Sequence, residues 1–105
     1  MAYQRVLDAL GDPTRRAVLE LLRSGPRSVG ALAEGLPVSR PAVSQHLRVL
    51  KEVGLVLDRQ EGNRRIYEVV PESLREVAAY LGTFWGGALE AFRSEVERAG
   101  GGDGP

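Results

Sequence analysis

The stretch SVGALAEGLPVSRPAVSQHLRVLKEVGL, residues 28–55, decides the fold of this chain. Ser28 is a plausible N-cap for a first helix with apolar residues at helical spacing, and residues 35–38 (GLPV) break that helix. Ser39 opens a second helix, and Pro41 lies in its first turn, where its missing N–H costs nothing. The stretch therefore predicts two short helices joined by a tight turn and closed by a glycine.

The second of these helices has two different faces. Val43, Leu47 and Leu50 recur at spacings of four and three, which predicts a buried face. Between residues 39 and 51 there are three cations and no acid, and the short helix fits a major groove. Serine, glutamine and arginine side chains can hydrogen-bond to base edges or phosphates, which favours DNA binding. Taken alone, however, this stretch could also be an ordinary helix pair with a solvated basic face. The exposed face carries Arg40, Ser44, Gln45, Arg48 and Lys51.

A basic β-hairpin is expected directly after this helix. Residues 55–60 and 65–70 are β-prone runs that enclose residues 61–64 (EGNR), a hairpin signal. Arg59, Arg64 and Arg65 lie at the expected tip. A basic hairpin after a recognition-type helix has the layout of a wing, which reaches along the DNA backbone or into a minor groove. The order of helix and hairpin argues against a merely solvated arginine-rich turn.

Three further helices are predicted around this centre. Residues 2–10 carry an amphipathic stripe, and Asp12 with Pro13 then starts a second helix as N-cap and first helical residue. Its Arg15–Arg16 pair is interpreted as solvated surface rather than as a phosphate contact. A long helix is expected from residue 72 to about residue 98, and residues 99–105 (AGGGDGP) are expected to be a flexible tail. Residues 1–98 would then form one domain, mainly α-helical with a β-hairpin.

The long helix predicts a homodimer. Its apolar stripe is wide enough to need two partners, and one small chain offers a single core. Gly82, Gly86 and Gly87 inside the helix each cost on the order of 1 kcal/mol relative to alanine, which indicates close approach of a partner helix, or else a kink or break near residue 86. A ligand pocket lined by the aromatic residues is a less favoured alternative. The first and last helices supply the candidate interface residues: Val6, Leu10, Leu81, Trp85, Leu89 and Phe92.

Composition excludes several classes of function. The chain has no cysteine, which rules out a disulfide framework, a thiolate metal site and a thiol redox switch. His46 is the only histidine and is a poor basis for a metal site, so we expect it to be a groove or phosphate contact or else a partly buried helix residue. No nucleophile or acid–base cluster can be assembled, so we expect neither an enzyme nor a cofactor. No run approaches a membrane span and the N-terminus does not resemble a signal peptide, so a cytoplasmic protein is expected.

The formal net charge of zero is unevenly distributed. Residues 1–70 hold eleven Arg or Lys against eight Asp or Glu, and residues 71–105 hold three against six. The basic part would face phosphates while the acidic part stays away from them.

Taken together, residues 10–22 (LGDPTRRAVLELL), 28–56 and 60–70 (QEGNRRIYEVV) resemble the ArsR-type family of bacterial winged helix-turn-helix repressors. The resemblance covers about residues 3–96 and rests on the Asp-Pro-Thr-Arg helix start, the Ser-Gln-His-Leu segment and the Gly-x-Arg-x-x-Tyr wing. In such proteins the first and last helices form the dimer, and the Ser-x-His-Leu helix enters the major groove. The resemblance implies DNA contacts by Ser39, Arg40, Ser44, Gln45, His46 and Arg48, with wing contacts by Arg64 and Arg65.

The chain departs from the metal-sensing members of that family. Residues 30–34 (GALAE) contain no cysteine pair, and the last helix contains no histidine. We therefore expect a metal-independent regulator that binds a double-stranded, inverted-repeat operator as a homodimer and represses transcription. A winged-helix protein-interaction module is the alternative from another class. A repressor with a small-molecule effector site near the last helix is a second alternative, with the effector unknown.

Overall fold

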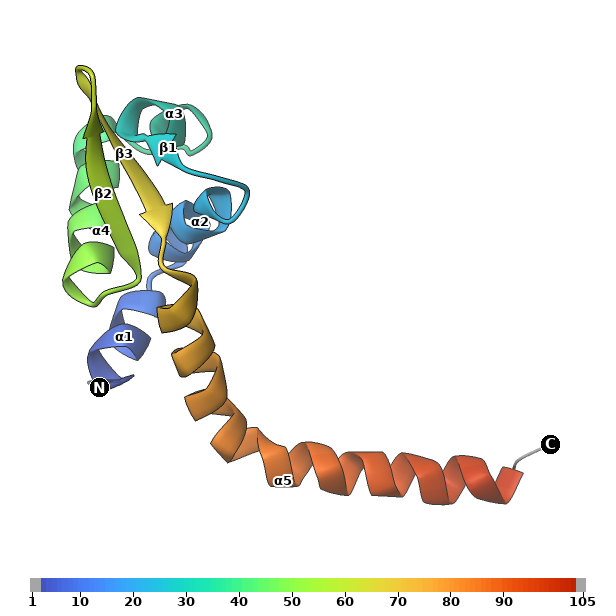
Figure 1. The fold of residues 1–105 in the computed structure, drawn as a ribbon. Coiled ribbons are helices and arrows are strands. Elements are labelled where there is room, and N and C mark those ends of the chain that lie inside the picture. The colour runs from blue at the N-terminus through green and yellow to red at the C-terminus, as the bar shows by residue number, and fades with distance from the viewer. Residues whose placement is uncertain (1–2, 104–105) are drawn as a thin grey trace. The chain divides into compact units, whose positions relative to one another are not determined.

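The computed structural model describes residues 3–103, with side-chain environments for all of them except residues 85, 86, 88, 89 and 100–103. The chain divides into two units, Met1–Leu74 and Arg75–Pro105, and each is described by itself. Five helices and three strands confirm the mainly α-helical class with a hairpin. In chain order the elements are α1 (Tyr3–Leu10), α2 (Pro13–Leu22), β1 (Arg27–Ser28), α3 (Val29–Glu34), α4 (Arg40–Glu52), β2 (Val56–Glu61), β3 (Arg64–Val69) and α5 (Pro71–Asp103) (Figure 1).

The start of α2 is fixed by its N-cap, as the sequence predicts. The Asp12 carboxylate accepts hydrogen bonds from the backbone amides of Thr14 at 2.8 Å and Arg15 at 3.0 Å, and Pro13 is the first helical residue. The amide of Arg15 is the main cause that lowers the pKa of Asp12 from its ordinary value. A carboxylate at this position also interacts favourably with the positive end of the helix dipole.

Serine caps define the two central helices. Ser28 Oγ accepts from the Ala31 amide at 3.2 Å to start α3, and Ser39 Oγ accepts from the Ala42 amide at 3.3 Å to start α4. Pro41 follows Ser39 in the first turn and has no amide hydrogen to be satisfied. The two helices therefore begin where the sequence places them.

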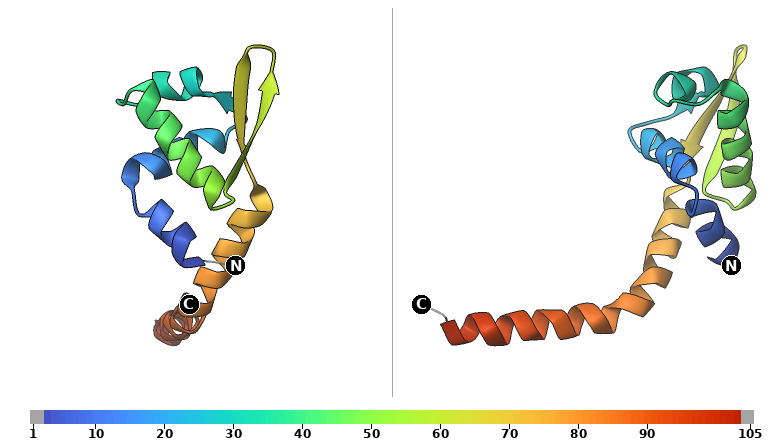
Figure 2. Two further views of the ribbon diagram at one scale, coloured as in Figure 1. Left: turned by 90° about the vertical axis from the view of Figure 1, so that its left-hand side faces the viewer. Right: turned by 180° about the vertical axis from the view of Figure 1, so that it is seen from behind.

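The core of the first unit lies between α2, α3, α4 and the strands. The buried face of α4 carries Val43, Leu47 and Leu50, each 0% exposed. This is the face that helical periodicity predicts. Figure 2 shows α4 running alongside the β2–β3 hairpin. In this hairpin, β2 packs on α4, and β3 packs on α2 and α3. The other elements contribute Val18, Leu19, Leu22, Leu32, Leu55, Val56 and Ile66 to this core.

The sheet has three antiparallel strands in the order β1–β3–β2. The two-residue strand β1 was missed by sequence reasoning, since two residues carry no readable alternation. The expected four-residue loop at 61–64 was also wrong, because Glu61 pairs with Arg64 and only Gly62 and Asn63 form the turn. Gly62 adopts a φ of 63°, as the first central residue of a type II′ hairpin turn does.

The long helix α5 is continuous from Pro71 to Asp103, so a break into two helices near residue 86, one of the alternatives that the sequence leaves open, does not occur. The helix also extends beyond residue 98, through glycines whose low helix propensity had indicated an end there. A Cβ added at Gly82 or Gly87 would meet no atom within 4 Å. Among the described residues, no helix is long and apolar enough to cross a membrane.

Large apolar side chains of α5 are exposed in the single chain. Phe84 is 62% exposed, Phe92 68% and Val96 51%. Tyr80 and Phe84 pack edge to face, with ring centroids 5.1 Å apart. Of the predicted interface residues, Leu10 and Leu81 are partly exposed, while the side chains of Trp85 and Leu89 lie outside the described residues. In α1, Val6 is only 2% exposed, so it belongs to the chain's own core and has little surface left for a partner.

Candidate nucleic-acid interface

The outer face of α4 is polar, basic and open to solvent. Its apolar positions are turned into the core, so the helical period leaves the intervening residues outside. Five of the six residues that the sequence assigns to major-groove contact are exposed. They share one short helix and its N-cap, and their side chains offer hydroxyl, amide and guanidinium groups: Ser39, Arg40, Ser44, Gln45 and Arg48.

His46 is the exception on this helix. It is partly buried, and its Nδ1 atom is buried without a hydrogen-bond partner among the described residues. This partial burial sets the imidazole apart from the exposed side chains of the same helix. The structure agrees with the alternative of a partly buried helix residue, and a DNA contact by His46 stays a prediction.

Three arginines on α4 and the wing are without a polar partner among the described residues. Arg40, Arg48 and Arg64 are exposed and make no hydrogen bond or ion pair within the part of the chain that the structure describes. A guanidinium carries five N–H donors in a rigid fork that matches phosphate and guanine acceptors. These donors are available to an external ligand without the loss of any internal bond.

Arg65 and Lys51, by contrast, are already engaged. Lys51 Nζ lies 2.8 Å from Asp58 Oδ1, and Arg65 Nη1 lies 3.0 Å from Asp58 Oδ2. The hydrogen bond from Lys51, followed by the bond from Arg65, holds the pKa of the Asp58 carboxyl below its ordinary value. The predicted phosphate contact by Arg65 would compete with this internal pair.

Arg59, the third arginine of the wing, is held within the hairpin. Its Nη1 atom lies 2.7 Å from Glu68 Oε1, and its Nε atom lies 3.1 Å from Glu61 Oε2. Glu61 is on β2 with Arg59, whereas Glu68 is on β3, so the Arg59–Glu68 pair links the two strands of the wing. Only Arg64 among the wing arginines is unpaired in the described residues.

The Arg15–Arg16 pair has a structural role that sequence reasoning did not anticipate. Arg15 Nη1 donates to the Ala9 carbonyl at 3.0 Å, and Arg16 Nη1 donates to the Leu10 carbonyl at 2.7 Å. Both acceptors are at the C-terminal end of α1, where helical carbonyls lack intrahelical partners. The interpretation as merely solvated surface was therefore wrong.

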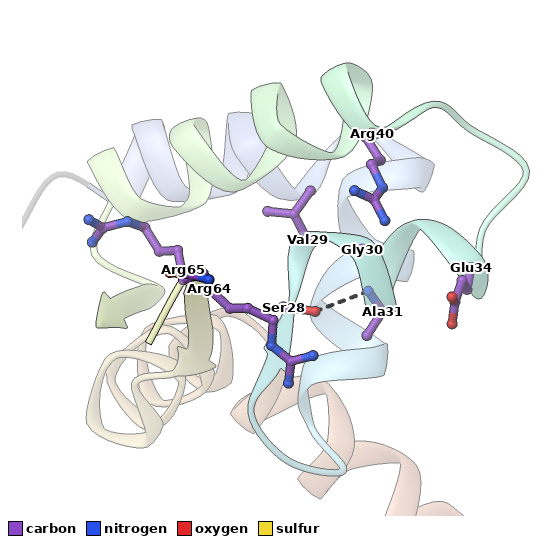
Figure 3. A pocket seen from close by; sticks show the side chains of 9 residues that line it. Ser28, Val29, Gly30, Ala31, Glu34, Arg40, Arg64 and Arg65 are labelled. Carbon is purple, nitrogen blue, oxygen red and sulfur yellow. Dashed lines mark hydrogen bonds between the residues drawn. The ribbon is translucent and has the colours of Figure 1, made fainter. Parts of the chain in front are cut away.

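An open pocket of about 400 Å³ lies between α3, the start of α4 and the wing. Figure 3 shows the side chain of Arg40 extending from α4 toward Gly30 of α3, while Arg64 and Arg65 point in opposite directions from the wing. A Cβ placed on Gly30 would lie 2.8 Å from Arg40 Nη2 and 3.3 Å from Cζ. The guanidinium of Arg40 therefore rests against bare backbone that only glycine provides.

Metal ligands are not clustered in this region. Within the residues that the structure describes, no three His, Cys, Asp or Glu side chains lie together as a metal ion would need. Asp58 is the most engaged carboxylate, and both of its oxygens already face cations. The chemistry of the exposed face is hydrogen-bond donation to an anionic or polar ligand.

Known proteins are similar to this chain in sequence and in fold. Residues 10–59 match the model of a helix-turn-helix domain family. The HTH-type transcriptional regulator Rv2034 of Mycobacterium tuberculosis is 49% identical over 96 residues, which cover 91% of this chain and 90% of the relative. This chain belongs to the ArsR-type family of helix-turn-helix transcriptional regulators.

Other relatives of this ArsR-type regulator agree with that membership. The transcriptional repressor SdpR of Bacillus subtilis is 33% identical over 79 residues, covering 75% of this chain and 88% of the relative. A crystal structure described as a possible transcriptional regulator for arsenical resistance has 42% identity and a TM-score of 0.73, with 85% of this chain and 93% of that chain covered. The membership confirms a winged helix-turn-helix DNA-binding regulator and not an enzyme.

One solved relative carries information on assembly. It is the homodimeric winged helix-turn-helix DNA-binding domain Mb0332 of Mycobacterium bovis, studied by solution NMR. Its identity to the ArsR-type chain is 33% and its TM-score 0.66, with 76% of this chain and 75% of that chain covered.

Sequence reasoning missed two residues of this interface. Asp58 reads as an ordinary strand acid, and no local pattern indicates that it reaches Lys51 of another element. Gly30 has a low helix propensity, and the space that its missing Cβ leaves for the Arg40 guanidinium is visible only in the structure. Both depend on the packing of segments that are separated along the chain.

Proposed function

We propose that this ArsR-type regulator is a homodimeric repressor that binds an inverted-repeat operator through the outer face of α4 and the tip of the wing. The observation that carries the proposal is the set of unpaired guanidinium groups of Arg40, Arg48 and Arg64, beside the exposed amide and hydroxyl of Gln45 and Ser44. Donors that no acceptor in the described part of the chain satisfies fit a polyanionic, hydrogen-bonding partner.

Different residues of α4 would contact different parts of the DNA. A single helix fits a major groove about 12 Å wide, with its N-terminal half nearest the bases. Ser44 and Gln45 would read base edges, because glutamine pairs with adenine and serine pairs with several bases. Arg40 and Arg48, on either side of them, would contact phosphates or guanine, and Arg64 would contact the backbone beside the groove.

A dimer would place two such helices in successive major grooves. Exposed Phe84, Phe92 and Val96 offer an apolar face on α5 that a second copy could cover. The solved relative from Mycobacterium bovis is described as homodimeric, which supports the same assembly here. Two-fold symmetry would then require half-sites roughly 34–36 Å apart, and so an inverted repeat.

The proposal includes neither a metal nor another cofactor. The chain has no cysteine and one histidine, whose Nδ1 atom is buried, so its ligands for a soft or borderline metal are few. Repression would follow from occupation of a promoter, and the cytoplasm is the compartment in which we propose that the protein acts. The related protein SdpR is described as a transcriptional repressor, which supports this direction of control.

The operator must be found before single residues are tested. Purified protein would be incubated with fragmented genomic DNA, and bound fragments would be sequenced and searched for an enriched inverted repeat. Arg48→Ala and Arg64→Ala are then compared with Arg23→Ala, whose exposed guanidinium is already paired with Glu20 on α2.

The two test variants should each weaken operator binding about tenfold or more, as expected for loss of one charged hydrogen bond of about 1.5–3 kcal/mol. Each should also reduce the slope of log affinity against log salt by about 0.9 if its contact is to phosphate. Arg23→Ala should match the wild type. Unchanged affinity in both test variants would refute the assignment of the interface, and the absence of any DNA binding would favour the protein-interaction alternative.

A further inference from the structure

The most constrained ion cluster of the first unit connects the recognition helix to the wing. Asp58 is the third residue of β2, and its side chain is only 9% exposed. One oxygen faces Lys51 in the last turn of α4, at 2.8 Å, and the other faces Arg65 in β3, at 3.0 Å. Each oxygen therefore has its own cation, from a different element.

Both cations remain accessible from solvent. The side chains of Lys51 and Arg65 are 55% and 49% exposed, whereas the acid between them is nearly covered. A phosphate could therefore attract either cation only in competition with Asp58. The unpaired Arg40, Arg48 and Arg64 meet no such competition from the described residues.

We propose that Asp58 is a specificity-determining positioning residue, which holds the wing against the end of α4 and withholds Lys51 and Arg65 from sequence-independent phosphate contacts. This inference rests on the DNA binding proposed above. Phosphate contacts supply most non-specific affinity, and they do not distinguish between sequences. By neutralising two cations, the carboxylate limits phosphate-driven affinity for any duplex, and by holding the wing against α4 it preserves the geometry that only operator binding needs. Both effects favour the operator over random DNA.

The Asp58→Asn variant should show a steeper salt dependence of DNA binding and poorer discrimination between sequences. Asp58→Asn keeps the side-chain shape and removes the charge that retains both cations. On a random-sequence duplex, the slope of log affinity against log salt should become steeper by up to about 1.8, because each released cation adds about 0.9. The ratio of operator affinity to random-duplex affinity should fall about fivefold or more.

Glu52→Gln is the matched control. Glu52 is exposed in the same terminal turn of α4 as Lys51, and it makes no ion pair within the described residues. The control changes the net charge by the same amount as Asp58→Asn without releasing a cation. Any general effect of added positive charge on DNA binding appears in both variants and can be subtracted.

A measurement without DNA tests the ion cluster itself. Lys51 is the only lysine in the chain, so its acylation by an amine-reactive ester can be followed by mass spectrometry, separately from the N-terminal amine. The reaction should be several-fold faster in Asp58→Asn than in the wild type or Glu52→Gln. Asp58→Glu retains the carboxylate, so it should restore slow acylation and wild-type discrimination, and it serves as a second variant if Asp58→Asn folds poorly.

The outcomes separate the inference from the proposed function. Equal acylation rates in Asp58→Asn and Glu52→Gln, or equal salt slopes in the two, would overturn the inference. Equal weakening of operator and random-duplex binding by Asp58→Asn would also overturn it, since a purely structural role predicts that pattern. A wild-type protein that binds neither duplex would refute the proposed function, while the acylation rates would still report on the ion cluster.

Discussion

Replacement of Gly30 by alanine should stabilise the fold and weaken DNA binding at the same time. The new Cβ would lie 2.8 Å from Arg40 Nη2, whereas heavy atoms in comfortable contact are about 3.5–4.0 Å apart. The guanidinium must therefore retreat by roughly 0.7–1.2 Å, which a flexible side chain achieves at little cost to the fold. Alanine inside α3 should add about 0.5–1 kcal/mol to the free energy of unfolding.

The displaced guanidinium should lose part of its contact with DNA. We expect operator affinity to fall about fivefold, corresponding to about 1 kcal/mol for one weakened charged hydrogen bond. Urea denaturation gives the stability, and fluorescence anisotropy with a labelled operator gives the affinity. A rise in the free energy of unfolding together with a fall in operator affinity would indicate a displaced arginine, because general damage to the fold would lower both.

A double-mutant cycle with Arg40→Ala provides the control for Gly30→Ala. In the Arg40→Ala background no guanidinium remains to be displaced, so Gly30→Ala should leave DNA affinity unchanged and still stabilise the helix. If Gly30→Ala weakens binding equally in both backgrounds, the contact between Gly30 and Arg40 is not the cause. An affinity equal to the wild type in the single variant would refute the reasoning directly.

Four further predictions follow from burial, charge and composition. Leu47→Ala should lower the free energy of unfolding by about 2–5 kcal/mol, because Leu47 is 0% exposed; a urea titration showing a loss well below that range would contradict the core described here. The pKa values of Asp12 and Asp58 are lowered in the folded protein, so the unfolded chain takes up protons at a higher pH than the folded one. The free energy of unfolding should therefore fall as the pH drops below about 4. Urea titrations at several pH values should show a shallower fall in Asp58→Asn. Phe92→Glu should shift sedimentation toward monomer, since Phe92 is 68% exposed on the apolar face of α5; an unchanged dimer would place the interface elsewhere. Zinc or nickel, added or chelated, should leave operator affinity within about twofold of the metal-free value, and a larger change would show metal sensing.

The helices and their start positions were predictable because their signals are local. Asp12 and Ser39 are followed by proline in the first turn, and each cap bond lies within three residues of its acceptor. The buried face of α4 was predictable for the same reason, since apolar spacing alone determines it. The strand β1 was not predictable, because its existence depends on pairing with β3 far along the chain.

The candidate interface was predictable in its residue types but not in its ion pairs. Exposed arginines on a basic helix and wing indicate DNA contact, and Arg48 and Arg64 have no ion pair with any residue that the structure describes. The same reasoning treated Arg65 as equivalent to Arg64, although one is held by an acid and the other is not. Charge counting cannot separate them, because the difference depends on which side of β3 each side chain leaves.

The turn at Gly62 and Asn63 illustrates a signal that was present and misread. Gly-Asn between two β-prone runs is a known two-residue hairpin signal, but the flanking polar residues extended the expected loop to four. Because Gly62 requires a positive φ, any other residue there would strain the turn. The wing is consequently longer and stiffer than the sequence reading implied.

The arginine contacts between α2 and α1 determine how movement would pass through this protein. Arg15 and Arg16 hold the last carbonyls of α1 from the first turn of α2, and α2 packs directly against α4. The helices α1, α2 and α4 are therefore in contact with one another, and α1 and α2 are joined by hydrogen bonds near Asp12. Because α1 is bound to α2 and α2 packs on α4, we expect a change in the position of α1 to alter the position of the outer face of α4, far from the bound DNA.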